Sequence, residues 1–279
     1  MAENLNEVVN KLEKRLRNLE SKTLSDVVIS RLVPPAGVTG NYLAKASGTD
    51  YDVEWRTGYL YYTTLYYTGT NTFSPATYPD LKAVRVRLVG GGGGGGGCAT
   101  TTASQSSAGG AGGGGGYSEE FIVMDSSTAS VTVTVGAGGA NGAAGANSGS
   151  AGGTTSFGAY LSATGGSGGG GDTASTAPVY GASGASPGAG SNGDLNLSGT
   201  AGGRSFSING SGDSMFWSYG GGSVFSPQSY LQASATGGAG NNGISYGMGG
   251  GGGVNTVSQT TARAGGDGSA GIVIVDVFV

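Results

Sequence analysis

Glycine is the feature that most constrains this chain, because it supplies 62 of the 279 residues and lies mainly in one part of the sequence. Its share is about three times the roughly 7% of an ordinary globular protein. Only five glycines precede Leu88, namely Gly37, Gly40, Gly48, Gly58 and Gly69. The composition therefore predicts a structural boundary near Leu88.

The longest glycine runs are Gly90–Gly97, Gly112–Gly116, Gly168–Gly171 and Gly249–Gly253. A flexible linker is the usual interpretation of such tracts. If they are ordered, each residue loses about 1–2 kcal/mol of backbone entropy, and glycine has no side chain to offset the loss. Several extended runs lying side by side offset it through backbone hydrogen bonds and Cα–H contacts. We therefore predict packed segments of the polyglycine II type.

Strand signals flank these runs, because apolar and polar residues alternate there. The expected strands are Tyr59–Tyr67, Leu81–Val89, Tyr117–Met124, Ala129–Val135, Thr155–Ala163 and Gly271–Val279. The last of these is so apolar that it has to be buried. We expect it to meet the first strand in one sheet, within a mainly β, sandwich-like domain over residues 59–279.

Apolar residues at the N-terminus follow a heptad pattern typical of a coiled coil. The seam consists of Leu5, Val9, Leu12, Leu16 and Leu19. We predict a short coiled coil over residues 1–24 and a linker or collar over 25–58. The alternative is an amphipathic helix packed on its own domain. Val and Leu at these positions favour two helices on general rules.

Charge and missing residue types exclude several functions. Arg204 and Arg263 are the only basic residues after Leu88, so that part of the chain is acidic and should bind neither nucleic acid nor an anionic membrane. There is no histidine, and Cys98 is the only cysteine, so we expect no enzyme, no metal site and no cofactor. We expect a soluble protein made in a cytoplasm, with no membrane insertion, and Cys98 as a small apolar residue beside a glycine run.

Two parts of the chain resemble bacteriophage tail fibre proteins. Residues 35–55, with Asp50-Tyr51-Asp52 and Glu54-Trp55, resemble a segment that recurs in these fibres. Residues 72–279 are similar to their glycine-rich C-terminal domain, through a Val-Arg-Val strand leading into polyglycine and a closing Gly-Ile-Val-Ile-Val strand. The resemblance implies a homotrimer in the virion tail, assembled in the host cytoplasm. Its N-terminal region would contact other tail or baseplate proteins, and its glycine-rich domain would contact a bacterial surface receptor.

A glycine scaffold offers no side chains for recognition, so we expect the inserts between the runs to bind the receptor. Aromatic and amide side chains suit sugar faces and protein hot spots. The expected receptor-binding residues are Met215, Phe216, Trp217, Tyr219, Phe225, Gln228 and Tyr230. The alternative is that these rings cover the edge of a small core. A second, weaker candidate is the segment 172–180.

Two other functions remain open at this point. One is a purely structural virion fibre or baseplate part. The other is a polysaccharide depolymerase, which needs a pair of carboxylates. Asp172, Asp194, Asp213 and Asp267 are available for that role, but their spacing marks no pair.

Overall fold

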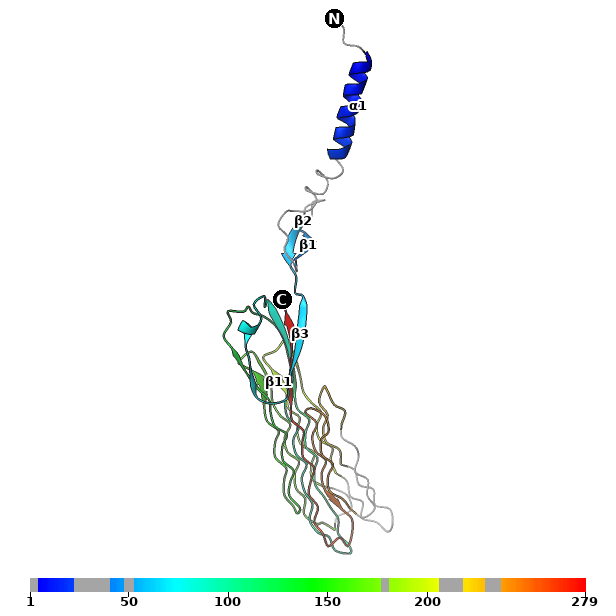
Figure 1. Ribbon diagram of the computed structural model, residues 1–279. Helices are drawn as coiled ribbons and strands as arrows, with labels where there is room; N and C mark the ends of the chain where they lie inside the picture. Colours follow the sequence, from blue (N-terminus) through cyan, green and yellow to red (C-terminus); the bar gives the residue numbers. More distant parts are fainter. Residues whose placement is uncertain (1–4, 23–40, 48–52, 177–180, 206–217, 229–236) are drawn as a thin grey trace. The chain divides into compact units, whose positions relative to one another are not determined.

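The computed structural model describes residues 5–22, 41–47, 53–176, 181–205, 218–228 and 237–279 (Figure 1). The chain divides into two compact units. The first comprises Met1–Leu60 together with Val279, and the second comprises Tyr61–Phe278.

The first unit contains a helix and a hairpin. Helix α1 spans Leu5–Lys22, and strands β1 (Asn41–Lys45) and β2 (Val53–Thr57) pair in antiparallel fashion. Of the predicted seam, Val9, Leu12 and Leu16 are exposed on α1, and Leu12 is 59% accessible. The side chains of Leu5 and Leu19 lie outside the described residues. The coiled coil itself stays a prediction.

The second unit is built on two five-stranded antiparallel sheets. The first sheet has the order β12-β7-β5-β14-β3. Its strands are β3 (Tyr61–Tyr67), β5 (Ala83–Val89), β7 (Tyr117–Val123), β12 (Leu195–Leu197) and β14 (Ile272–Phe278). The second has the order β11-β10-β9-β8-β4. Its strands are β4 (Asn71–Phe73), β8 (Val131–Thr134), β9 (Thr155–Phe157), β10 (Leu161–Ala163) and β11 (Gly190–Ser191).

Two smaller elements complete this unit. Strands β6 (Ser107–Ala108) and β13 (Val254–Asn255) pair with each other, and the 3₁₀-helix η2 spans Pro75–Thr77. With these sheets the predicted mainly β fold is confirmed.

One hydrophobic core lies between the two five-stranded sheets. Because side chains alternate along a strand, β5 and β14 direct every second residue inward, including Val86 and Val275. Phe73, Val133 and Phe157 of the other sheet belong to the same buried cluster. Residues far apart in sequence thus hold the two sheets together.

The strand predictions hold except at one place. As expected, the last strand meets the first: β14 pairs with β3 along one edge and with β5 along the other. The predicted strand Thr155–Ala163 is wrong, because the chain turns back at Gly158 and forms the hairpin β9–β10. Gly158 has a φ of +52°, which glycine adopts without strain, and Tyr160 N–H donates to the Phe157 carbonyl to close the turn.

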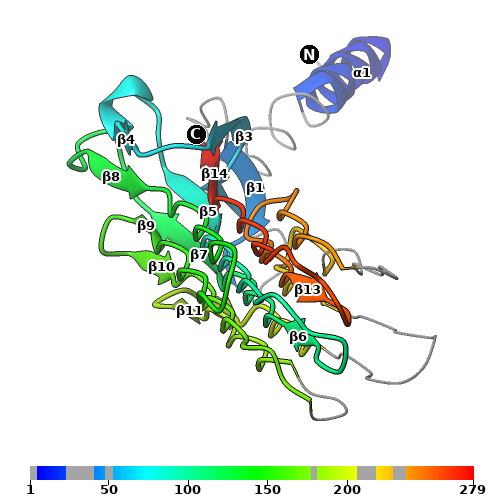
Figure 2. The same cartoon turned by 90° about the horizontal axis from the view of Figure 1, so that it is seen from below.

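Extended glycine segments continue from the sheets and lie side by side (Figures 1 and 2). Residues 90–97, which follow β5 directly, are all buried. Their N–H groups donate in rotation to three neighbouring segments, and each neighbour receives every third donor at 2.8–3.0 Å. Gly90, Gly93 and Gly96 donate to Gly116, Gly113 and Gly110; Gly91, Gly94 and Gly97 donate to Gly153, Ser150 and Asn147; Gly92, Gly95 and Cys98 donate to Ser269, Gly266 and Arg263.

The carbonyl groups of the same run bond three further segments, also in rotation. Gly91 and Gly94 accept from Gly166 and Gly169; Gly92 and Gly95 accept from Gly139 and Gly142; Gly93 and Gly96 accept from Gly250 and Gly253. The run 90–97 is therefore surrounded by six backbone segments. Its buried N–H groups and the carbonyls of Gly91–Gly97 are paired without help from side chains, which meets the requirement that buried backbone groups be satisfied.

The close approach of these backbones excludes side chains from the interior of the bundle. A Cβ atom at Gly95 would lie 1.9 Å from the Gly251 carbonyl oxygen and 2.4 Å from its carbon. Both contacts are to backbone, so no side-chain rotation relieves them. In the outer segment 136–143 the buried positions are Gly136, Gly139 and Gly142, whereas Ala137 and Ala140 are exposed.

We predict that Gly95→Ala lowers the free energy of unfolding by about 3 kcal/mol or more, the upper end for overpacked interiors. The methyl group would force the 90–97 and 250–253 segments apart and break their hydrogen bonds. Urea unfolding of the purified chain measures the change.

Gly69→Ala is the matched control, because a Cβ there meets nothing within 4 Å. It should leave stability within about 1 kcal/mol of wild type. Equal stability of the two variants would contradict the packing described here.

Candidate functional site

A pocket on the second unit is a candidate for ligand binding in the part of the chain that the structure describes. Its volume is about 460 Å³, within the range of roughly 300–1,000 Å³ typical of small-ligand sites. It is lined by Pro227, Gln228, Asn241, Asn242, Ile244, Ser245 and Met248. We call it the amide pocket, since three of its seven lining residues carry side-chain amides.

The glycine segments hold the walls of the amide pocket in place. Gly251 N–H donates to the Asn241 carbonyl at 2.8 Å, and Gly243 N–H donates to the Asp267 carbonyl at 2.8 Å. The side chain of Asn242 is oriented as well, because its Oδ1 accepts from Asp267 N–H at 2.8 Å.

The described lining of the amide pocket combines amides, a hydroxyl and apolar surface, and none of these seven residues is charged. Met248 is buried, while Ile244 is 76% exposed. The Gln228 amide is exposed, and its Nε2 lies 3.5 Å from Thr200 Oγ1, the limit of a hydrogen bond. Such a lining suits a neutral ligand rich in hydroxyl groups, which needs both donors and acceptors.

A second uncharged surface lies where glycine segments end at the short β6–β13 ribbon. Residues 99–106 and 256–262, which we call the distal loops, bond each other: Thr101 N–H donates to the Gln259 carbonyl at 2.9 Å and Ser258 N–H to the Thr102 carbonyl at 2.8 Å. Gln105 accepts from Thr102 N–H through its Oε1 at 3.2 Å. The distal loops therefore present hydroxyl and amide groups on an internally bonded framework.

The predicted receptor-binding residues separate into three groups. Met215, Phe216, Trp217 and Tyr230 lie outside the described residues. Tyr219 is half-buried, with its ring against Gly203, and Phe225 packs edge-on against Tyr117 at a centroid distance of 5.7 Å. Among the three described members, Gln228 is the one that lines the amide pocket.

Of the residues that line the amide pocket, only Gln228 was predicted from the sequence. Asn241, Asn242 and Ile244 also lie in an insert between glycine-rich stretches, but they lack the aromatic rings that distinguished residues 215–230. The pocket also depends on Pro227 and Gln228 reaching this insert, and that contact has no sequence signature.

Three of the four aspartates considered above for a catalytic pair are engaged in structural bonds. Asp172 Oδ2 accepts from Ala108 N–H at 2.8 Å, Asp194 Oδ2 from Phe121 N–H at 3.1 Å, and Asp267 Oδ1 from Asn141 N–H at 2.8 Å. Asp213 and residues 177–180 lie outside the described part. Burial raises the pKa of Asp172, although hydrogen bonds from Ala108 and Ser107 oppose the shift.

Three further observations bear on chemistry and location. Within the described ranges, no three His, Cys, Asp or Glu side chains are grouped so as to hold a metal ion. No helix in the part of the chain that the structure describes has the length and apolarity to cross a membrane. Cys98 is fully buried at the end of its glycine run, and this burial raises the pKa of its thiol to about 11.

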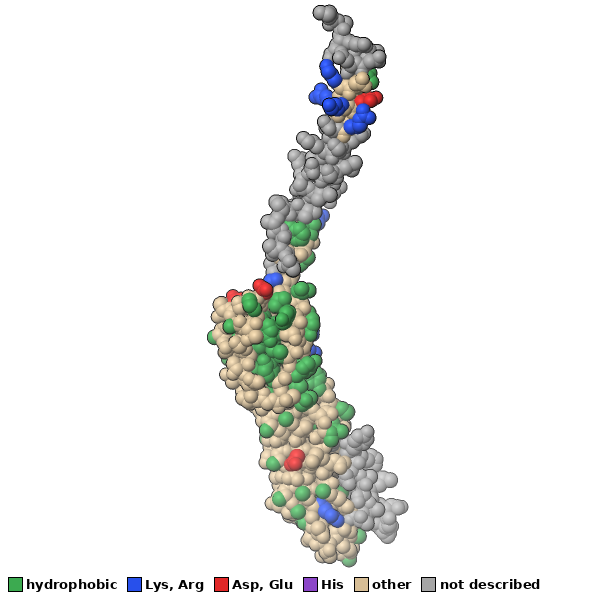
Figure 3. All heavy atoms as spheres, viewed as in Figure 1, with side chains coloured by type: hydrophobic (Ala, Val, Ile, Leu, Met, Phe, Trp, Pro, Cys, Tyr) green, Lys and Arg blue, Asp and Glu red, His purple; other side chains and the backbone are tan. Residues whose placement is uncertain are grey.

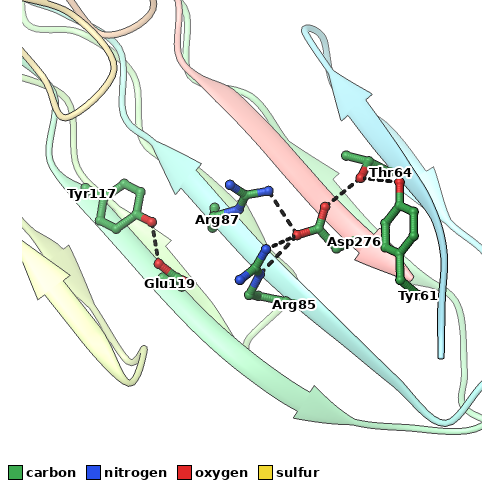
Figure 4. A network of polar contacts seen from close by, with 7 residues as sticks. All are labelled: Tyr61, Thr64, Arg85, Arg87, Tyr117, Glu119 and Asp276. Atoms are coloured by element: carbon green, nitrogen blue, oxygen red, sulfur yellow. Dashed lines mark hydrogen bonds and ion pairs between the residues drawn. The ribbon is translucent and has the colours of Figure 1, made fainter. Parts of the chain in front are cut away.

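A polar network lies on the outer face of the β12-β7-β5-β14-β3 sheet (Figure 4). Asp276 on β14 is only 3% exposed, and its Oδ2 accepts from Arg85 Nη2 at 2.7 Å and from Arg87 Nη2 at 2.9 Å. Thr64 donates to its Oδ1 at 2.6 Å. Burial raises the pKa of Asp276, but the bonds from Thr64 and Arg85 and the charges of both arginines outweigh it, so the net shift is downward. The network ties three strands together.

Comparison with known proteins gives one match. The family described as a glycine-rich domain matches residues 68–278, about three quarters of the chain. No curated protein matches this sequence.

We predict that Asp276→Asn lowers the free energy of unfolding at pH 7 by about 1–3 kcal/mol, because two arginines lose their charged partner. This loss of stability is smaller than that expected on breaking a fully buried ion pair, because the Arg85 side chain is 44% exposed. A depressed carboxyl pKa contributes stability above the unfolded-state pKa and loses it as pH falls through the folded-state pKa.

The difference in unfolding free energy between Asp276→Asn and wild type should therefore become smaller below about pH 4. Urea unfolding at pH 7 and pH 3 measures it, with Asp80→Asn, an exposed carboxylate, as the control. An unchanged stability of Asp276→Asn at pH 7 would show that the network contributes nothing.

Proposed function

The chain belongs to the glycine-rich domain family, and we propose that it is a bacteriophage tail fibre or tail-tip adhesin that binds a bacterial surface receptor during host attachment. The receptor is a glycan or an outer-membrane protein, and the protein acts by binding, with no catalytic step. It resides in the virion tail after assembly in the host cytoplasm. The resemblance of residues 35–55 and 72–279 to tail fibres supports this proposal.

The observation that carries the proposal is the rotation of backbone hydrogen bonds around the run 90–97. Three-residue periodicity and six bonded neighbours are what polyglycine II helices require. We propose that the glycine segments are such helices and form a rigid body. A body made of backbone specifies position but has few side chains for recognition. Recognition then falls to the inserts, as in other proteins whose binding loops stand on a rigid scaffold.

We assign receptor contact to the amide pocket and the adjoining insert that holds Tyr219, Phe225 and Gln228. The uncharged, hydroxyl- and amide-bearing lining favours a neutral glycan over an acidic one, because no described basic side chain lines the pocket. Phe225 is an exposed aromatic ring of the kind on which sugar faces pack, and Ile244 adds exposed apolar surface to the pocket.

The N-terminal unit fits the role of assembly and attachment. Val9, Leu12 and Leu16 lie exposed at heptad positions of α1, which supports a coiled coil between copies of the chain. We propose a homotrimer, as the tail-fibre resemblance implies, with this region also contacting other tail or baseplate proteins. An 18-residue helix is marginal on its own, so the second unit has to contribute to assembly.

We predict that the labelled full-length chain binds a subset of bacterial strains in a panel, and that loss of one surface polysaccharide or outer-membrane protein abolishes the binding. Gln228→Ala should weaken binding about tenfold, or ~1.4 kcal/mol, because it removes an amide from the pocket. Flow cytometry with a concentration series gives the affinity.

Gln105→Ala, which removes an amide from the distal loops, is the matched control. If it weakens binding and Gln228→Ala does not, the receptor contact lies on the distal loops instead of the amide pocket. If the chain binds no strain, the remaining function is that of a purely structural virion part. If it releases reducing ends from purified polysaccharide, the result indicates a depolymerase.

A further inference from the structure

We propose that the outer face of the β12-β7-β5-β14-β3 sheet is the surface through which copies of this chain pack against one another. We call it the aromatic face. The inference rests on the self-association that the proposed function includes, and it concerns a surface remote in the sequence from the helical seam.

The aromatic face carries large side chains where a solvated sheet face carries polar ones. The exposed residues are Tyr61 and Tyr66 on β3, Phe121 and Val123 on β7, and Leu195 and Leu197 on β12. Phe278 on β14 connects them: its ring centroid lies 6.3 Å from that of Tyr61 and 5.7 Å from that of Phe121. Rings from three strands thus form one row across the sheet.

The outer face of the other sheet provides a comparison within the same unit. Its outward positions are short and polar: Thr72, Thr132, Thr134, Ser156 and Ser162. An antiparallel sheet normally packs one face on the core and exposes a polar face. The aromatic face breaks this pattern, and hydrophobic side chains gather on the sheet-bearing part of the unit, whereas backbone and polar side chains dominate the glycine segments (Figure 3).

The apolar area is large for a surface left in water. Tyr66 is 67% exposed and Val123 is 70% exposed. At roughly 200 Å² for a large side chain, the six exposed residues present about 600 Å². That is the upper end of what monomeric proteins expose in one patch, and approaches the ~800 Å² that each partner buries in a standard interface.

The charges at the centre of the aromatic face are balanced within it. Arg85 and Arg87 are matched by Asp276, which they contact, and by Glu119, which accepts from the Tyr117 hydroxyl at 2.6 Å (Figure 4). The face has no net charge to attract an acidic or a basic partner. A neutral, ring-rich surface is matched by another of its kind, and a second copy of this chain supplies one.

Helix α1 gives an independent reason to expect a second copy. Its exposed heptad residues favour self-association, and linked copies meet at a high effective concentration. Two weak contacts on one chain, the helical seam and the aromatic face, then stabilise the same assembly.

The test measures the mass of the full-length chain by light scattering and sedimentation over a concentration series. Wild type should be oligomeric at micromolar concentration. Tyr66→Glu combined with Val123→Glu places buried, unpaired charges in the interface and should raise the dissociation constant at least about tenfold. Thr72→Glu combined with Ser162→Glu, the same change on the polar face of the other sheet, should leave the mass unchanged.

Hydroxyl-radical footprinting of wild type gives a second readout that needs no variant. Tyr66 and Phe121 should be protected in the oligomer and should become labelled on dilution, whereas Tyr160, exposed in the turn between β9 and β10, should be labelled throughout. A monomeric wild type, an unchanged mass for the Tyr66→Glu/Val123→Glu chain, or labelling of Tyr66 in the oligomer would each overturn the proposal. An oligomer built on this face that binds no strain would refute the receptor role alone.

Discussion

Hydrogen bonding in three directions, between backbones that approach too closely for side chains, is the constraint on which this structure depends. In an ordinary sheet a strand bonds two neighbours, and side chains fill the space above and below it. Here the run 90–97 bonds six neighbours, and no volume is left for a Cβ at Gly95. The backbone entropy that glycine loses on folding is offset by backbone hydrogen bonds alone. Each segment is therefore stable only when all of its neighbouring segments are present.

The two sheets solve a problem that glycine segments cannot solve themselves. Glycine has no side chain that could specify which segment it packs against, whereas the side chains of the strands specify how the strands pair. β5 leads directly into residue 90, residue 116 leads into β7, and residue 271 leads into β14, so the register of the sheet fixes the register of the segments. The buried Asp276, bonded by Arg85 and Thr64 from the strands on either side, makes any other pairing of these three strands costly.

Much of this fold could be predicted from local patterns. Alternating Val84, Arg85, Val86 and Arg87 indicate a strand with one buried face, and the apolar final strand requires a central position in a sheet. The hairpin at Gly158 was missed because β9 and β10 are short and share one apolar pattern. The aromatic face was missed for a different reason: Tyr59–Tyr67 reads as a strand, but which of its rings point outward depends on a bulge opposite Phe278. The amide pocket needs two inserts from separate parts of the chain, and no spacing rule connects them.

The three-residue rotation of hydrogen bonds sets a rule for how the length of such a body changes in evolution. An insertion of one or two residues in a glycine segment would direct every later amide to the wrong neighbour. An insertion of three residues keeps each donor opposite its acceptor and adds one repeat of the hydrogen-bond pattern. Lengths should therefore vary in triplets, and in several segments at once, while the sheets and the inserts between the segments vary independently. Variation in the length of the glycine segments and variation in the sequence of the inserts are thus separable in a chain of this design.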